Sequence, residues 1–152
     1  MNLLPLYRCR FTYERSWSVP ASGQDAKETQ HFLLADGRCE GRIAGALIGA
    51  NHPRQRSDGT FEVNFQGVIE TDDGEVVYFD HRGYGRAYPI GRRQIVGAVT
   101  HLCNGEAYQW LNDTVAVSTG EVRTDGDATE LVIDVAELVW EPLSPRGHLG
   151  PR

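Results

Sequence analysis

The sequence predicts an all-β protein in which one antiparallel sheet curls into a barrel. First, apolar and polar residues alternate with a period of two in segment after segment, as they do in half-buried strands. Second, short Asp-Gly turns separate these segments, and no window of twelve residues shows a helical stripe. Third, many of the 17 glycines fall inside the predicted strands, where they permit sharp coiling. A flattened sandwich is the alternative.

The first part of the chain is predicted to supply three strands. Residues 3–17 interleave Leu, Tyr and Phe with Arg and Thr and form the first strand. The polar residues 18–29 form a loop. Residues 31–35 form a short strand that is closed by the hairpin signal Asp36-Gly37. Residues 41–48 alternate small and aliphatic side chains and form the third strand.

The middle of the chain contains the strongest hairpin. Ser57-Asp58-Gly59 marks a turn, and residues 60–70 follow it as a strand. Thr71-Asp72-Asp73-Gly74 is the next turn and leads directly into the partner strand, residues 75–82. Residues 94–102 form a further strand, so this region should contribute three strands.

The last part of the chain is predicted to add one helical turn and two strands. The helical turn covers residues 108–112. The strands cover residues 113–123 and 129–140, and Thr124-Asp125-Gly126-Asp127 joins them. Eight or so strands with tight turns favour a barrel, because closure removes exposed sheet edges.

Length and composition indicate one globular domain. A chain of 152 residues can bury a single core, and no linker or fixed-period repeat divides it. We therefore expect one domain over residues 1–152, with its core at about 4–140 and a flexible tail at 141–152. A barrel of this size is either filled by side chains or holds one small ligand at its mouth.

Charge and cysteine content exclude several classes of protein. The net charge of −6 argues against a nucleic-acid surface. Three widely spaced cysteines without a Cys-x-x-Cys pair argue against a disulfide framework. No apolar stretch is long enough to cross a bilayer, and the first residues do not resemble a signal peptide. We expect a cytoplasmic protein with no membrane partner.

The sequence predicts neither a metal nor a cofactor. His31, His52, His81 and His101 could meet in space, but no metal-binding histidine spacing is present. There is no nucleophile elbow and no phosphate loop. We therefore expect any chemistry to use side chains alone.

Three segments resemble the DUF3237 family, also called UPF0311. They are "ETQHFLLADGRCEGRIAGALIGANHP", "DGTFEVNFQGVIETDDGEVVYFDHRGYGR" and "YQWLNDTVAVSTGEV". The resemblance extends from about Leu4 to Trp140, and its most specific elements are Thr71-Asp72-Asp73-Gly74 and Trp110-Leu111-Asn112. It implies a compact, calycin-like antiparallel β-barrel, the architecture of lipocalins, and leaves the activity open.

This chain departs from the family pattern in two places. Many relatives have a glycine-rich segment with Asp-Trp where this chain has residues 50–54, and an Asp-x-Arg where it has Asn64-Phe65-Gln66. If these residues line a pocket, the ligand of this chain differs from the ligands of those relatives.

The predicted strand 60–70 has one apolar and one polar face. Phe61, Val63, Phe65 and Ile69 share the first face, and Asn64 and Gln66 lie on the second. The polar face borders either solvent or a wet barrel interior. Uncharged amides are poor strand formers, and inside a cavity they can donate and accept hydrogen bonds without a charge to desolvate. We therefore expect Asn64 and Gln66 to face the interior.

Two residues are candidates for proton transfer. His52 ends a strand before Pro53 and has the residue type most suited to acid–base work, although a lone histidine is more often structural. Asp80 could act as a base beside the phenol of Tyr78, or it could form a structural ion pair with Arg42 or Arg82.

The remaining candidates would bind the substrate. Arg54 or Arg82 would meet an anionic group, Tyr84 would cover an aromatic ligand from a glycine-rich loop, and Trp110 would form a flat wall. The complete set of expected binding residues is Asn51, Arg54, Asn64, Gln66, Tyr78, Arg82, Tyr84, His101 and Trp110.

These residues favour a small-molecule-binding barrel. As an enzyme it would be a cofactor-free isomerase, lyase or cyclase acting on a small aromatic or carboxylated metabolite. The alternatives are a non-catalytic carrier or sensor, and a structural protein. The apolar face of residues 60–70 also favours a homodimer or larger homo-oligomer.

Overall fold

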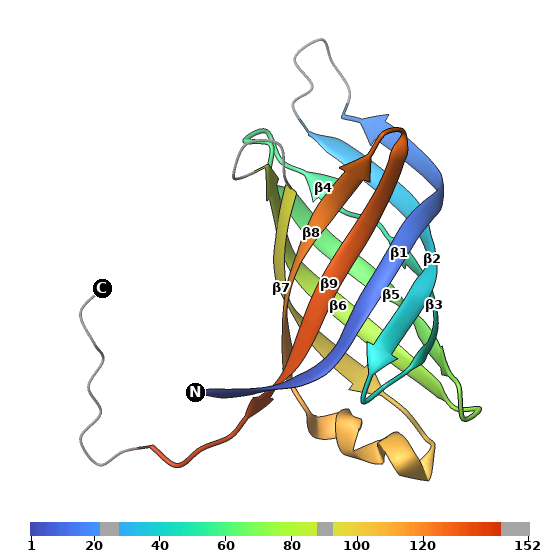
Figure 1. Cartoon of the computed structure of the whole chain (residues 1–152). Helices are drawn as coiled ribbons and strands as arrows, with labels where there is room; N and C mark the ends of the chain where they lie inside the picture. The colour runs from blue at the N-terminus through green and yellow to red at the C-terminus, as the bar shows by residue number, and fades with distance from the viewer. Residues whose placement is uncertain (22–27, 88–92, 144–152) are drawn as a thin grey trace.

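The computed structural model describes residues 1–21, 28–87 and 93–143 and forms a closed antiparallel barrel of eight strands (Figure 1). A ninth, two-residue strand lies at its rim. The strands are β1 (Asn2–Pro20), β2 (Thr29–Gly41), β3 (Gly45–Asn51), β4 (Arg54–Gln55), β5 (Phe61–Thr71), β6 (Val76–Ala87), β7 (Arg93–Leu102), β8 (Ala116–Asp125) and β9 (Ala128–Val139), with one 3-10 helix, η1 (Glu106–Asp113).

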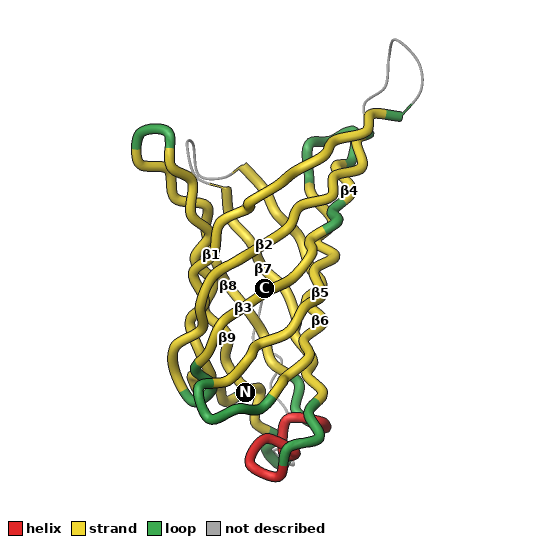
Figure 2. Tube along the Cα trace, turned by 90° about the vertical axis from the view of Figure 1, so that its right-hand side faces the viewer, coloured by secondary structure: helices red, strands yellow, loops and turns green. Residues whose placement is uncertain are grey.

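Strand β1 closes the barrel because it pairs with β9 on one side and with β2 on the other. The remaining neighbours follow in the order β9, β8, β7, β6, β5, β3, β2, and every pairing is antiparallel. The short β4 pairs with β2 and β5 at the end opposite η1 (Figures 1 and 2). The barrel prediction is therefore confirmed.

The core fills the half of the barrel that is nearer η1. Phe65 of β5 lies between Phe11 and Phe79, with ring centroids 5.2 Å and 5.0 Å away. Leu111 of η1 belongs to the same cluster and is fully buried, so the helix closes this end. Buried and exposed residues alternate along parts of β1 and β3, as the period of two predicts, whereas Leu131, Val132 and Ile133 of β9 are buried in succession.

The hairpin predicted at Asp36-Gly37 is wrong. Both residues lie inside the continuous strand β2, where they pair with Thr12 and Phe11. Gly37 is needed for close packing, because a Cβ there would lie 2.0 Å from the carbonyl oxygen of Arg10. Here the Asp-Gly dipeptide marks a close approach between two paired strands and not a turn.

The other turn predictions are confirmed. Gly59, Gly74 and Gly126 adopt positive φ angles of 84°, 92° and 60°, which glycine tolerates at no steric cost. The predicted loop 18–29 is shorter than expected, since β1 continues to Pro20 and β2 starts at Thr29. Residues 22–27, and most of the expected tail, lie outside the described residues.

Candidate functional site

A cavity of about 400 Å³ opens at the end of the barrel where β4 lies. We call it the barrel-mouth cavity. Most of its walls are apolar, and a few polar groups converge on it. The lining residues are Tyr13, His31, Leu33, Asn51, Pro53, Gln55, Phe61, Val63, Gly85, Ile95, Val122, Thr129 and Leu131.

Asn51 supplies the most buried polar group of the cavity. It is the last residue of β3 and points inward, and its Nδ2 donates a hydrogen bond of 2.9 Å to the hydroxyl of Tyr13. Its Oδ1 accepts a longer bond, 3.4 Å, from the backbone N–H of Asn64. The amide is therefore anchored from two strands and presents a fixed polar surface.

His31 is the histidine among the described residues lining this cavity. Its Nε2 lies 3.2 Å from Oε1 of Gln55, and its Nδ1 lies 2.8 Å from the Ser18 hydroxyl. An amide oxygen can only accept, so Nε2 carries the proton and Nδ1 accepts from Ser18. The ring also packs near Phe61, with centroids 5.5 Å apart.

A second hollow lies on the outer surface of the barrel beside β5 and β6. This outer groove has a volume of about 720 Å³ and is more polar than the barrel-mouth cavity. Val63 borders both hollows. The outer groove is lined by Gln30, His52, Arg54, Glu62, Val63, Asn64, Arg82, Gly83 and Tyr84.

Three side chains beside the outer groove form a closed ring of hydrogen bonds. Asn64 donates to Nδ1 of His52 over 2.9 Å, and Nε2 of His52 donates to Gln66 over 2.7 Å. Gln66 completes the ring by donating to Oδ1 of Asn64 over 2.8 Å. Both nitrogens of His52 are therefore engaged within the protein, and this ring fixes its tautomer.

Asp80 extends this ring and is held as a carboxylate. Partial burial alone would raise its pKa, but hydrogen bonds from Gln66 and Arg82 outweigh that effect and lower the pKa. An ion pair with Arg82, one of the two alternatives for Asp80, is therefore formed. A lowered pKa makes a carboxylate a weaker base.

The expected orientation of Asn64 and Gln66 is wrong. These amides lie on the outer face of β5, and the inward face carries Phe65 and Ile69, which are 2% and 0% exposed. The reason is the apolar surface area of the strand. Burying two large hydrophobic side chains stabilises the fold more than enclosing two amides would.

Most of the predicted site residues gather at one of the two hollows. His52, Arg54, Asn64, Arg82 and Tyr84 meet at the outer groove, with Gln66 and Asp80 beside them. Tyr84 does so from strand β6, so the loop expected for it is wrong. Asn51 reaches the barrel-mouth cavity.

The other three predicted residues lie elsewhere. Tyr78 is exposed on the outer face of β6. His101 is buried in the core, where its Nε2 lies 2.9 Å from the Tyr7 hydroxyl. Trp110 is on η1, and the guanidinium of Arg42 lies 5.1 Å from its ring.

The sequence prediction missed Tyr13, His31, Gln55 and Phe61 as cavity residues. A signal for His31 was present, because it lies in phase with Leu33 and Ala35, which face inward. The sequence contains no comparable signal for Gln55, since the two-residue strand β4 is too short for a periodic pattern.

A protein-family model matches residues 1–138, and its description is "Protein of unknown function (DUF3237)". The chain belongs to this family. No match was found among curated proteins. Within the described residues, no three His, Cys, Asp or Glu side chains gather as a metal site, and no helix is long and apolar enough to span a membrane.

Solved structures share this fold at low sequence identity. A β-barrel-like protein from Acinetobacter baumannii is 20% identical, with a TM-score of 0.74, covering 90% of this chain and 94% of its own. A protein of unknown function from Clostridium acetobutylicum is 16% identical, with a TM-score of 0.76, covering 91% and 100%. A protein from Penicillium herquei, described as an enzyme, is 20% identical, with a TM-score of 0.63, covering 88% and 93%.

Proposed function

We propose that this DUF3237 protein binds a small, uncharged, partly aromatic organic molecule in the barrel-mouth cavity. The observation that carries this proposal is the cavity itself, whose volume of about 400 Å³ lies within the range of small-molecule sites. Apolar walls with a few convergent polar groups are typical of such sites, and barrel mouths are a common place for them.

The sequence favoured either an aromatic or a carboxylated ligand, and the charge of the cavity lining supports the aromatic one. The described lining residues include no arginine or lysine. A carboxylate buried there would lose its hydration without gaining a cation, which is costly. Arg54 and Arg82, the residues expected to meet an anion, border the outer groove instead. A neutral ligand that hydrogen-bonds to Asn51 or Gln55 fits the cavity better.

Two related dyes can test this proposal. Phenylnaphthylamine is neutral and aromatic, and anilinonaphthalene sulfonate is its anionic analogue. We expect the neutral dye to bind, with increased fluorescence, and the sulfonate to bind at least about tenfold more weakly, because a desolvated unpaired charge costs more than 1 kcal/mol. Equal binding of both dyes would contradict a neutral-selective cavity.

A matched pair of variants locates the dye. Val122→Phe places a larger side chain in the cavity wall and should abolish binding of the neutral dye. Val96→Phe makes the same change at an exposed position on β7 and should leave binding unchanged. If Val122→Phe is folded and binds the dye normally, the ligand does not occupy the barrel-mouth cavity.

We propose acid–base catalysis on this ligand as a second candidate function, with His31 as the proton-transfer group. The supporting observation is that His31 lies at the cavity wall, where a substrate that displaces Gln55 from its Nε2 would meet the ring directly. A cofactor-free isomerisation, elimination or ring closure needs such a group in contact with the substrate.

Metabolite capture separates an enzyme from a carrier. The protein would be incubated with small molecules extracted from its host cells, and retained compounds would be identified by mass spectrometry. An enzyme releases a converted product, and His31→Gln retains the compound without converting it. If the wild-type protein returns every captured compound unchanged, the carrier is the better description.

A further inference from the structure

The outer groove contains a line of residues that are in register across four strands. Gln30 of β2 pairs with Arg54 of β4. Arg54 pairs in turn with Glu62 of β5, and Glu62 pairs with Tyr84 of β6. All four residues line the groove. Three strand spacings give this line a length of about 14 Å, so an extended ligand can contact all four strands at once.

The groove presents hydrogen-bond donors and acceptors that the described part of the protein does not use. Nε of Arg82 bonds to Asp80, but neither of its terminal nitrogens has a partner there. The carboxylate of Glu62 has only Arg56 nearby, at 4.0 Å. Gln30 donates to backbone carbonyl groups, and its side-chain oxygen accepts no bond from the described residues. A ligand that both donates and accepts hydrogen bonds fits this lining.

The charges at the groove favour a neutral ligand. Arg54 pairs with Glu28, and Arg82 pairs with Asp80. Glu62 lies in the lining together with both arginines. An anion would be repelled by Glu62, and a cation would be repelled by the arginines. A hydroxyl group meets neither repulsion, and it donates and accepts at the same oxygen atom.

Exposed aromatic rings border the groove on two sides. Tyr84 lines it and is 48% exposed. Phe32 is 43% exposed, and its ring centroid lies 6.3 Å from that of His52, which is also in the lining. Trp17 extends this side, with its ring centroid 5.8 Å from that of Phe32. The slightly positive hydrogens on the carbon atoms of a sugar ring can pack on the electron-rich face of such a ring.

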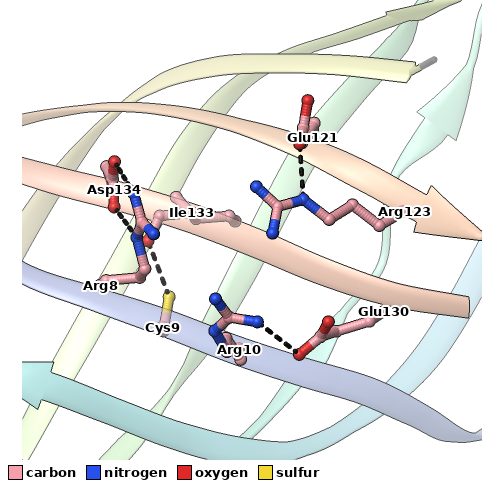
Figure 3. Close-up of polar contacts among 8 residues, drawn as sticks. All are labelled: Arg8, Cys9, Arg10, Glu121, Arg123, Glu130, Ile133 and Asp134. Atoms are coloured by element: carbon pink, nitrogen blue, oxygen red, sulfur yellow. Dashed lines mark hydrogen bonds and ion pairs between the residues drawn. The ribbon is translucent and has the colours of Figure 1, made fainter.

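A second hollow, on the outer face of β1, β8 and β9, has a different lining. There Arg8 pairs with Asp134, and Arg123 pairs with Glu121 (Figure 3). This hollow measures about 190 Å³, and its described lining residues include no aromatic side chain. Paired surface charges without aromatic rings are typical of a face that water covers. The aromatic borders of the outer groove are therefore not a general property of the barrel surface.

We propose that the outer groove and the adjoining Phe32 bind a neutral oligosaccharide. The rings of Tyr84 and Phe32 stack on the faces of sugar rings at the two sides of the groove. Between them, Arg82 donates to sugar hydroxyl groups, and Glu62 and Gln30 accept from them. This site lies on the outside of the barrel, so its ligand is a different molecule from the one in the barrel-mouth cavity.

The first test offers the wild-type protein an array of neutral linear oligosaccharides of glucose, xylose, mannose and N-acetylglucosamine, with proline-rich peptides on the same array. We expect at least one oligosaccharide to be retained. The corresponding monosaccharide should bind at least about tenfold more weakly, because one sugar ring cannot contact both sides of the groove. Raising the salt concentration from about 50 mM to about 500 mM should change the dissociation constant by less than about twofold, since the ligand is uncharged.

Each opposite result would overturn the proposal. Retention of no oligosaccharide would do so, and retention of a proline-rich peptide alone would assign the groove to a protein partner. Binding that disappears at high salt would indicate a charged ligand.

Two tyrosines of β6 locate the site. Tyr84→Ala removes the ring from the groove and should raise the dissociation constant of the retained oligosaccharide at least about tenfold, whereas Tyr84→Trp keeps a flat ring and should restore binding. Tyr78→Ala is the matched control, because Tyr78 is 43% exposed on the same strand but lies outside the groove lining, and it should bind as the wild type does. Circular dichroism checks that each variant is folded. If folded Tyr84→Ala binds normally, or if Tyr78→Ala weakens binding equally, the oligosaccharide does not occupy the outer groove.

Discussion

The two ends of the barrel interior differ in how well they are packed. Near η1 the inward side chains leave a void of only about 10 Å³ among Tyr7, Phe65, Phe79 and their neighbours. At the mouth the same strands enclose about 400 Å³. Strand alternation is identical at both ends, so side-chain size and not backbone pattern separates a core from a cavity.

Along strand β6 the inward side chains become smaller from the packed end to the mouth. Its inward positions are Val77, Phe79, His81, Gly83 and Gly85, in the direction from η1 to the mouth. Side-chain volume falls to nothing over the last two positions. Close packing stabilises the end near η1, and the loss of side-chain volume leaves space for a ligand at the other.

The largest expected effect is loss of packing at the filled end. Phe65→Ala removes a buried ring that contacts Phe11 and Phe79, and it should lower the free energy of unfolding by about 3–5 kcal/mol. Phe61→Ala makes the same change at the cavity wall, where the ring is only partly buried, and should cost about 1 kcal/mol. Urea denaturation of both variants measures the difference. Equal losses would show that the mouth is as important for stability as the core.

The second effect is a dependence of stability on pH that originates at the filled end. Burial lowers the pKa of both His81 and His101 to about 4, and nearby Asp80 opposes this only partly at His81. Unfolded histidine has a pKa near 6.5, so between about pH 6.5 and 4 the unfolded chain binds more protons than the folded chain. The free energy of unfolding should therefore fall as the pH decreases through this window, by up to about 3 kcal/mol for each histidine.

Single substitutions assign this pH dependence. His81 bonds to Ser118 and His101 bonds to Tyr7, so His81→Gln and His101→Gln retain polar groups of similar size. Each variant should have a flatter stability profile between pH 6.5 and 4.5 than the wild type, measured by urea denaturation at each pH. An unchanged slope in both variants would place the acid sensitivity elsewhere.

The sequence predicted the fold because the fold depends on periodic features. Two such features are the alternation in residues 60–70 and the glycine turns such as Gly74. Both depend on local sterics and can therefore be recognised in one amino-acid sequence. The orientation of that strand was wrong because two amides were weighted above the apolar area of Phe65 and Ile69. Orientation is decided by the whole barrel and not by one strand.

The candidate site was harder to predict for the same reason. The sequence favoured His52 because its neighbours are polar. In the structure His52 lies on the outer face, and Asn64 and Gln66 bond to its two ring nitrogens. His31 was overlooked, although its phase with Leu33 places it inside. Its partner Gln55 belongs to β4, which pairs with β2, distant in sequence, as well as with the next strand, β5. Such pairings appear only once the barrel is closed.

The smallest expected effect lies at the boundary between the packed and hollow regions. A Cβ at Gly83 would lie 2.0 Å from the carbonyl oxygen of Val96, whereas a Cβ at Gly85 would meet Phe61 at 3.5 Å, an ordinary contact. Gly83→Ala should therefore cost about 2 kcal/mol through backbone displacement. Gly85→Ala should change the free energy of unfolding by less than about 1 kcal/mol, with a tendency to stabilise, because alanine restricts the unfolded chain. Thermal unfolding of the two variants measures both effects. Equal destabilisation by the two alanines would mean that tight packing continues past Gly83 toward the mouth, and the space available to a ligand would be correspondingly smaller.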